Sequence, residues 1–175
     1  MRYFFDTEFL ENGKTIDLIS IGIVCEDGRE LYLQNSGFNF HSADTWLKQN
    51  VLSKLTEFDI ESGRFTVEKY NTDIWKQKHE IAHEVNQFIT GDDIELWGEY
   101  CAYDFVALCQ LWGKAIDKPS NIPWLAKDIQ QLITDKAILP ALPTNENPHN
   151  ALDDAKHIFN KYKFITEFKR LGITK

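Results

Sequence analysis

The sequence contains little cysteine, no long apolar run and fewer basic than acidic side chains. Three cysteines in 175 residues, with no paired spacing, exclude a disulfide framework and a structural zinc site, and they favour reduced thiols. No apolar run approaches the roughly 20 residues that cross a bilayer, and Asp6 follows Phe4 and Phe5 too early for a signal peptide. We therefore expect a cytoplasmic protein that makes no membrane contact.

The shortage of basic residues also restricts the possible partners. The chain has 19 Lys and Arg against 27 Asp and Glu, which gives a formal net charge of −8. A protein that grips a long duplex is usually basic, so this charge argues against a sequence-reading DNA binder. It is compatible with an enzyme that handles one nucleic-acid end, because bound metal ions can offset phosphate charge.

The hydrophobic pattern predicts a single α/β domain over residues 1–175. Hydrophobic residues make up 43% of the chain, which excludes a disordered tail. Apolar or β-rich runs predict strands over 2–7, 17–24, 30–34 and 94–97. Helices are predicted over 43–50, 72–90 (capped by Thr72 or Asp73 and stopped by Gly91), 102–112, 127–133 and 150–171, whereas 57–67, 118–123 and 140–148 are expected to be loops or short elements. This order indicates a mixed sheet of about five strands flanked by helices.

Two acidic residues lie on the first predicted strand. Asp6 and Glu8 are two positions apart, so their side chains point to the same face of the strand. Asp104 opens the predicted helix that follows the strand over 94–97, and it is expected to lie near the carboxyl end of that strand. Charge at a helix N-terminus is the alternative reading of Asp104.

A third acidic motif opens the last predicted helix, where residues 149–154 read HNALDD. At about 100° per residue, Asp154 falls at the edge of the apolar stripe of this helix, and Asp153 falls on the opposite side. Asp154 can therefore reach the edge of a sheet, while Asp153 suits solvent and the first turn of the helix. His149 precedes the helix and can lean over a site from its loop.

Four converging carboxylates and a histidine suit the hydrolysis of a phosphodiester. Such acids would repel one another strongly without a bound cation, and hard divalent ions prefer carboxylate oxygens. Two Mg²⁺ ions about 4 Å apart can activate a water and neutralise the leaving oxygen. A neutral histidine can accept the proton of the attacking water.

A competing metal motif occupies the predicted helix over 72–90. His79, Glu80 and His83 match the H-E-x-x-H pattern of zinc peptidases. Both histidines fall on the polar side of the helix, and the extended metzincin form fails because Asn86 and Ile89 replace its glycine and third histidine. We interpret the motif as a solvated helix face, with a zinc peptidase (using Glu99 as a third ligand) as the alternative.

The residues 5–9 (FDTEF), 100–104 (YCAYD) and 149–154 (HNALDD) together resemble the DEDDh family of 3′-to-5′ exonucleases, which have a ribonuclease H-like fold. The chain is most similar to the mycobacterial-type 3′-to-5′ exoribonuclease subfamily, and residues 106–113 (VALCQLWG) are the most specific part of the likeness. The resemblance covers residues 1 to about 165. It departs from the family at Tyr100, where many members carry asparagine.

The resemblance implies a role for each matching residue. Asp6, Glu8 and Asp154 would bind a pair of Mg²⁺ or Mn²⁺ ions, with Asp6 bridging the pair. Asp104 would act on the second ion through water, and His149 would be the general base. Phe9, Leu10 and Tyr103 would contact the terminal nucleotide, although ordinary packing is the alternative for Phe9 and Leu10.

The family also implies the overall activity: a homodimer that hydrolyses nucleic acid from 3′ ends and releases 5′-mononucleotides. RNA is the expected substrate on the resemblance alone. A DNA-directed or dual-specificity exonuclease of the same fold is the alternative. A second alternative is a catalytically silent nucleic-acid-binding protein. The presence of all five catalytic residue types argues against it.

Overall fold

The computed structural model describes residues 1–62, 64–65, 73–134 and 136–171. Six strands form one sheet in the order β6-β3-β2-β1-β7-β8. Their bounds are β1 Arg2–Glu11, β2 Ile16–Cys25, β3 Glu30–Asn35, β6 Trp75–Lys76, β7 Glu95–Gly98 and β8 Ala126–Asp128. β2 is antiparallel to both of its neighbours, β1 and β3, and β7 and β8 run parallel to β1. The predicted mixed α/β sheet is confirmed, with β6 and β8 too short to stand out in the sequence.

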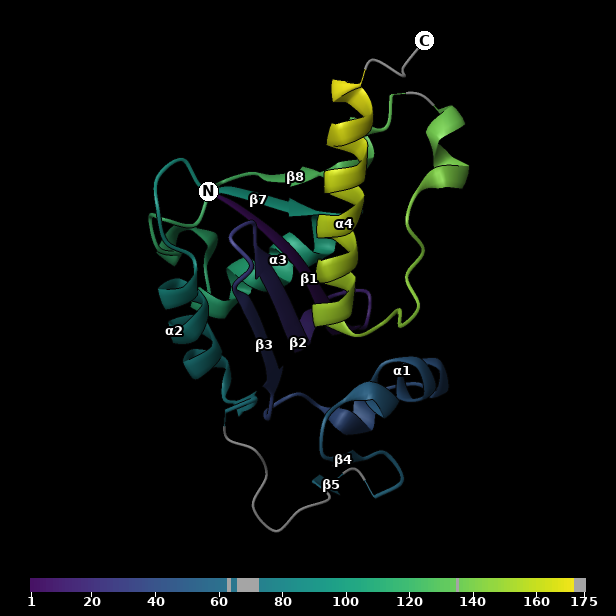
Figure 1. Cartoon of the computed structure of the whole chain (residues 1–175). Helices are drawn as coiled ribbons and strands as arrows, with labels where there is room; N and C mark the ends of the chain where they lie inside the picture. Colours follow the sequence, from purple (N-terminus) through teal and green to yellow (C-terminus); the bar gives the residue numbers. More distant parts are fainter. Residues whose placement is uncertain (63, 66–72, 135, 172–175) are drawn as a thin grey trace.

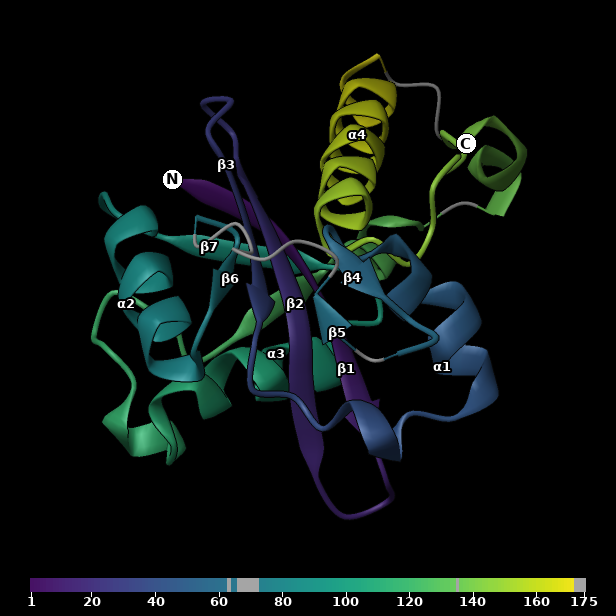
Figure 2. The ribbon, with the colours of Figure 1, turned by 90° about the horizontal axis from the view of Figure 1, so that it is seen from below.

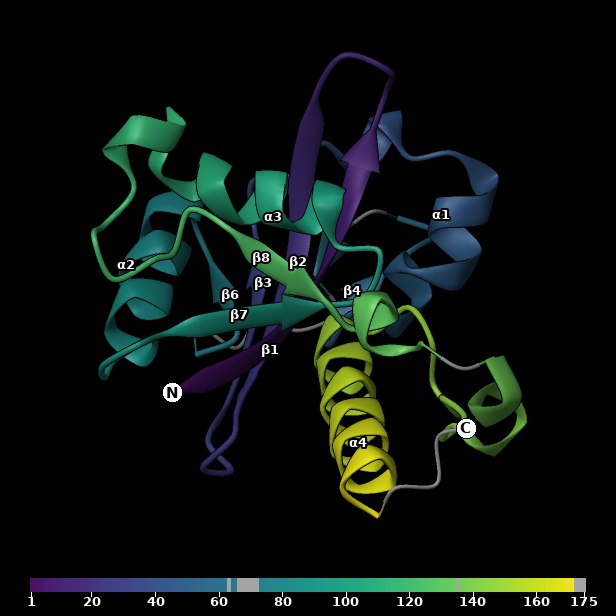
Figure 3. The ribbon, with the colours of Figure 1, turned by 90° about the horizontal axis from the view of Figure 1, so that it is seen from above.

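Helices cover both faces of this sheet. The α-helices are α1 Thr45–Asn50, α2 Lys78–Phe88, α3 Ala102–Cys109 and α4 Ala151–Arg170. Shorter 3₁₀ segments cover Phe40–Ser42, Leu52–Lys54, Gln110–Trp112, Ala115–Asp117, Ile129–Leu132 and Lys136–Ala141, and β4 (Phe58–Asp59) pairs with β5 (Arg64–Phe65) in a separate hairpin. Figures 2 and 3 show α4 on one face of the sheet, with α2 and α3 on the other.

The alternation of side chains along β1 explains these two layers. Tyr3 and Phe5 point into the apolar core under α2 and α3, together with Ile81 of α2. Phe4 points to the opposite face, where its ring stacks on Phe159 of α4 at a centroid distance of 4.7 Å. Because Asp6 and Glu8 share the parity of Phe4, β1 directs both carboxylates to the α4 side.

A glycine on β2 allows α4 to approach the sheet closely. Gly22 pairs with Asp6 across the β1–β2 ladder. A Cβ atom built on Gly22 would lie 2.2 Å from the carbonyl oxygen of Ala151, so no larger residue fits without moving the first turn of α4. That turn carries Asp154, and Gly22 therefore sets its distance from Asp6.

The prediction for residues 72–90 is wrong at the start of the helix. α2 begins at Lys78, after Gln77 and Glu80 form a reciprocal capping box, and Trp75 lies in the short strand β6. Thr72, one of the two expected caps, lies outside the described residues. Trp75 is buried among the residues around Leu10, so its tertiary packing outweighs the helical spacing of this segment.

The predicted helix over 127–133 is also wrong. Ala126–Asp128 forms β8 on the edge of the sheet, and a 3₁₀ segment follows over Ile129–Leu132. Backbone pairing of β8 with β7 favours the strand, and Asp128 then caps the 3₁₀ turn by accepting a hydrogen bond from Gln130. α3 is likewise shorter than expected, because its last turn tightens into the 3₁₀ segment before Gly113.

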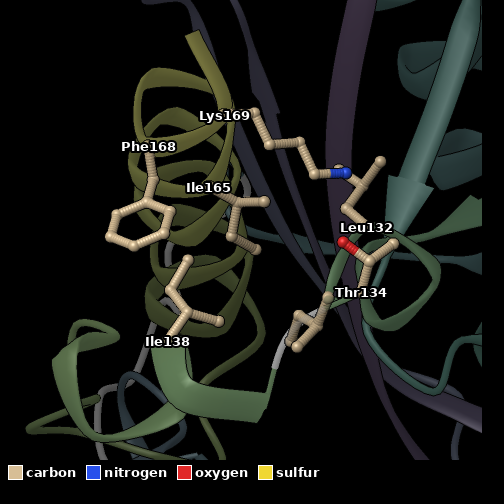
Figure 4. Close-up of a pocket in the computed structure, with 7 residues that line it drawn as sticks. Leu132, Thr134, Ile138, Ile165, Phe168 and Lys169 are labelled. Carbon is tan, nitrogen blue, oxygen red and sulfur yellow. The ribbon is translucent and has the colours of Figure 1, made fainter. Parts of the chain in front are cut away.

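The end of α4 packs against the 3₁₀ segment Lys136–Ala141. Ile138 and Ile165 line a cavity of about 10 Å³ there, and Figure 4 shows the two side chains next to each other. That volume suits about one water molecule, so the cavity is a packing defect rather than a ligand site. Among the described helices, none is both long and apolar enough to cross a bilayer.

Candidate active site

The two acids of β1 lie where the strand continues beyond its neighbour β7. The last residue pair between these strands joins Phe4 to Trp97, so Asp6 and Glu8 follow the point where β7 stops pairing with β1. Asp6, Glu8 and Asp154 each offer a carboxylate oxygen, and these three atoms lie within 4.8 Å of one another. We call these three residues the acid group.

Asp104 occupies the free edge of β1 beside the acid group. Its Oδ1 accepts hydrogen bonds from the backbone N–H of Thr7 at 3.0 Å and from the Thr7 hydroxyl at 2.7 Å. These bonds replace the ladder that β7 no longer supplies. They hold the buried Asp104 side chain at this edge of β1. The fourth predicted acid therefore borders the acid group without joining it.

Asp154 links α4 to the loop that precedes it. Its Oδ2 accepts a hydrogen bond from the backbone N–H of His149 at 2.8 Å, and its Oδ1 accepts one from the side-chain amide of Asn145. Asp153 instead accepts from Asn147 and lies outside the acid group. Of the two adjacent acids, Asp154 is thus the one that the helix directs to the sheet, as its place on the apolar stripe predicts.

His149 leans over the site from the loop, as expected. Its backbone has φ of +66°, a left-handed conformation that is uncommon for a non-glycine residue. Its ring meets Trp46 of α1 edge to face, with ring centroids 5.1 Å apart. Asn150 then caps α4 by accepting hydrogen bonds from Leu152 and Asp153.

The three residues expected to contact substrate lie in different environments. Phe9 is half-buried and stacks on the exposed ring of Tyr103, with centroids 6.1 Å apart. Leu10 is buried with Ile19 and Leu52 in a separate apolar cluster. Phe9 and Tyr103 can therefore offer ring surface to a base, whereas Leu10 supports the strand beneath them.

A cavity of about 510 Å³ opens above the acid group, between β1, α1 and the His149 loop. Its wall includes the four predicted acids, His149 and Phe9. Two exposed aromatic residues, Trp46 and Tyr100, complete its rim. The lining residues come from segments far apart in the sequence, and Figure 1 shows two of these segments, α1 and the N-terminal end of α4, near each other.

The four predicted acids of this cavity have raised pKa values. Burial, reinforced by the charge of Asp154, raises the pKa of Glu8 to about 8. Burial and the charge of Asp104 raise the pKa of Asp6 well above its usual value. Burial also raises the pKa of Asp104 and of Asp154, against the opposing effect of their hydrogen bonds from Thr7 and His149. A bound cation would remove this electrostatic penalty, so the acid group fits a divalent metal ion.

The alternative zinc motif is not assembled in the structure. His79 and His83 are exposed on the outer face of α2. Glu99, the possible third ligand, instead receives a hydrogen bond from Gln130 and an ion pair from Lys161 at 2.7 Å. Within the described residues, the acid group is the one cluster with metal-ligand geometry.

Several residues that shape the site belong to no sequence motif. Thr7 and Asn145 hold two of the acids, Gly22 sets the approach of α4, and Trp46 contacts His149. The threonine within the D-x-E motif is the one signal that the sequence offers, because alternation along a strand turns Thr7 away from Asp6 and Glu8. The other contacts join segments whose pairing depends on the tertiary fold.

The fold is one that solved exonuclease structures share. Exonuclease I superposes with a TM-score of 0.62 at 10% identity, over 95% of this chain and 40% of that structure. S. pombe Pop2p, in a form with bound Mg²⁺ and Mn²⁺, superposes with a TM-score of 0.57 at 14% identity, over 97% of this chain and 83% of that structure. At these identities the likeness establishes the fold.

Sequence similarity identifies the family. Residues 1–166 match the model of the 3′-5′ exoribonuclease Rv2179c-like domain. The 3′-5′ exoribonuclease Rv2179c of Mycobacterium tuberculosis H37Rv is 37% identical over 175 residues, which cover 98% of this chain and 97% of the relative. The chain therefore belongs to the Rv2179c-like 3′-5′ exoribonuclease family, which confirms the predicted subfamily and class of enzyme.

Proposed function

We propose that the chain is a metal-dependent 3′-to-5′ exoribonuclease that releases 5′-mononucleotides from RNA 3′ ends. The observation that carries the proposal is the acid group. Its carboxylate oxygens from β1 and α4 lie within 4.8 Å of one another, in a cavity that also contains Asp104 and His149. Membership of an exoribonuclease family supports both the reaction and the choice of RNA.

The proposal includes two Mg²⁺ or Mn²⁺ ions, held by Asp6, Glu8, Asp104 and Asp154. When bound, the ions would lower the pKa of a coordinated water and neutralise charge on the leaving oxygen. The chain supplies the carboxylates in positions fixed before substrate arrives, since β1, α3 and α4 each belong to the packed core. Thr7 prevents Asp104 from turning away, through its two hydrogen bonds.

His149 is proposed as the general base. Its backbone N–H is fixed by Asp154, and its ring lies on the wall of the cavity next to Trp46. A neutral imidazole nitrogen in this position can accept the proton of the attacking water and release it to solvent through the open side of the cavity. Loss of the imidazole should lower kcat far more than it changes KM.

Phe9 and Tyr103 are proposed to receive the terminal base. Their rings already stack on each other, and Tyr103 is 56% exposed. Aromatic platforms bind single-stranded nucleic acid with little dependence on sequence. Leu10 is included as a support of this contact, because its burial fixes the strand that carries Phe9.

The remaining parts of the proposal concern assembly and setting. We propose one domain over residues 1–175, a homodimer, and a cytoplasmic location. Relatives of similar fold include an E. coli exonuclease I structure in complex with a dT13 oligonucleotide, at a TM-score of 0.62 and 11% identity. DNA is therefore the competing substrate that the experiment must include.

The test uses RNA and DNA oligomers labelled at either end, with Mg²⁺ or with a chelator. With 5′-labelled RNA the proposal predicts a ladder that shortens one nucleotide at a time from the 3′ end. With 3′-labelled RNA it predicts immediate release of labelled mononucleotide. Chelator should stop both reactions. Digestion that continues in chelator would overturn the metal-dependent mechanism, and faster digestion of DNA would transfer the assignment to a deoxyribonuclease.

A further inference from the structure

A short segment packs against the loop that carries His149. α1 and the 3₁₀ turn Leu52–Lys54 form this segment, which comes between β3 and the β4–β5 hairpin. Its Trp46 touches the His149 ring, and the ammonium of its half-buried Lys54 donates a hydrogen bond to the carbonyl oxygen of Pro148. The first contact involves a side chain of the loop, and the second involves the loop backbone.

The base of this segment is firmly anchored. Val51, Leu52 and Leu55 are buried, each at most 7% exposed, in an apolar cluster with Leu10 and Ile19 of the sheet. Lys54 lies between two of these anchors, so its Cα is fixed relative to β1. Its ammonium is therefore held near the His149 loop by the core rather than by a flexible surface segment.

The two hydrogen bonds at the loop act on a single peptide unit. Lys54 binds the carbonyl of Pro148, and Asp154 accepts from the N–H of His149. These two groups are the ends of one planar peptide, so the unit is gripped from both sides. The next torsion along the chain is the φ of +66° at His149, which is disfavoured for a residue with a Cβ.

Lys54 also faces the acid group. Its positive charge lowers the pKa of Glu8 and of Asp154, against the larger effect of burial. In the described part of the chain, no ion pair connects it to either carboxylate. The ammonium therefore binds the Pro148 carbonyl, and its charge acts on the two acids without an ion pair.

We propose that Lys54 is a positioning residue for His149: it clamps the Pro148–His149 peptide and holds the imidazole over the acid group. This inference rests on the proposed function. It assigns Lys54 no contact with the substrate and no part in proton transfer. A chain without the clamp should keep its metal site and its substrate affinity, and it should present the base in the correct place for a smaller fraction of the time.

The kinetic test compares Lys54→Met and Lys54→Arg with a matched control, Lys14→Met. Lys14 lies in the exposed β1–β2 turn, so its loss changes the net charge equally without touching the site. We expect Lys54→Met to lower kcat roughly tenfold or more with KM changed less than about twofold, and Lys54→Arg to restore most of kcat. The control should leave both constants unchanged.

A double-mutant cycle separates positioning from other roles. If Lys54 acts through His149, Lys54→Met should have almost no further effect on the single-turnover rate in a His149→Ala background, measured with Mn²⁺ and enzyme in excess. An equal loss in both backgrounds would overturn the proposal. A rise in KM with unchanged kcat would also overturn it, and would make Lys54 a phosphate contact instead.

Hydrogen exchange tests the clamp without any need for activity. We expect the His149 amide of the Lys54→Met chain to exchange at least about tenfold faster than that of the unaltered chain, with exchange in the β1–β2 core unchanged. Unchanged exchange at His149 would contradict the clamp even if the protein is an active nuclease. Conversely, faster exchange in a protein without nuclease activity would uphold the clamp and overturn the proposed function.

Discussion

Half-buried carboxylates from β1 and from the residue after β7 line the same cavity, and they differ in how their charge is balanced. Glu99 is paired with Lys161 at 2.7 and 2.8 Å and receives a further hydrogen bond from Gln130. Asp6 and Glu8 have no ion pair among the described residues, and their pKa values are raised.

The comparison separates structural charge from functional charge. A carboxylate that serves the fold is given a cation of its own, because an unpaired buried charge is strongly destabilising. The acid group has no such cation from the chain, and this costs stability. A site that binds an external cation needs carboxylates that are not already paired. Removal of a carboxylate charge from the acid group should therefore stabilise the fold, whereas removal of the cation that pairs with Glu99 should destabilise it.

The largest expected effect concerns activity in the acid group. Asp6→Asn keeps the shape of the side chain and removes a metal ligand, so we expect kcat/KM on RNA to fall by roughly 10³-fold or more while the circular dichroism spectrum is unchanged. Asp153→Asn is the matched control, because Asp153 lies outside the acid group and pairs with Asn147. An active Asp6→Asn chain, or an inactive Asp153→Asn chain, would contradict the assignment.

The second prediction concerns stability without metal. Glu8→Gln removes a repelled charge whose folded pKa is about 8, against an ordinary 4.5. A raised acid pKa destabilises the fold only as pH rises above the ordinary value, and the penalty is complete near the folded pKa. We expect the free energy of unfolding of the variant to exceed that of the parent by about 4 kcal/mol at pH 8 in chelator, and by almost nothing at pH 4.5. Urea denaturation at both pH values measures the free energy of unfolding. A variant less stable than the parent at pH 8 would contradict the claim that the Glu8 charge destabilises the fold.

The third prediction concerns the paired carboxylate. Lys161→Met leaves Glu99 without its cation. This loss should matter because both side chains are only 15–17% exposed. We expect the free energy of unfolding at pH 7 to fall by about 2 kcal/mol. Arg170→Met, which breaks the exposed pair with Glu167, should produce no measurable change. Equal effects of the two substitutions would show that burial does not distinguish these pairs.

The smallest effect is expected on the outer face of α2. His79→Ala combined with His83→Ala removes the H-E-x-x-H motif from an exposed helix surface. Nuclease activity and the free energy of unfolding should both stay within experimental error, because neither side chain touches the acid group. Loss of activity in this double variant would revive the zinc site.

Local patterns were sufficient for much of the fold. Alternation along β1 predicts that Asp6 and Glu8 share a face, and helical periodicity separates Asp154 from Asp153, because both depend on the geometry of a single element. The start of α2 and the strand β8 could not be predicted in this way. Burial of Trp75 and pairing of β8 with β7 decide them, and both contacts involve distant parts of the chain.

In the candidate site, too, some features follow from local sequence patterns and others from tertiary contacts. The identities of the four acids and of His149 follow from motifs, and the structure places them around one cavity. Their supports, such as Gly22 beneath Ala151 and Lys54 on Pro148, carry no motif. A glycine or a lysine acquires its role here from a neighbour that is more than 90 residues away in sequence, so the sequence pattern gives no sign of it.

The most direct test of the account is the thermal stability of the full chain with and without Mn²⁺ at pH 6 and pH 8. If the acid group holds the metal, millimolar Mn²⁺ should raise Tm by several degrees at pH 8, less at pH 6 where protons compete for the carboxylates, and not at all in Asp6→Asn. A Tm that does not respond to Mn²⁺, or that rises equally in Asp6→Asn, would show that the carboxylates of β1 and α4 do not form a metal site.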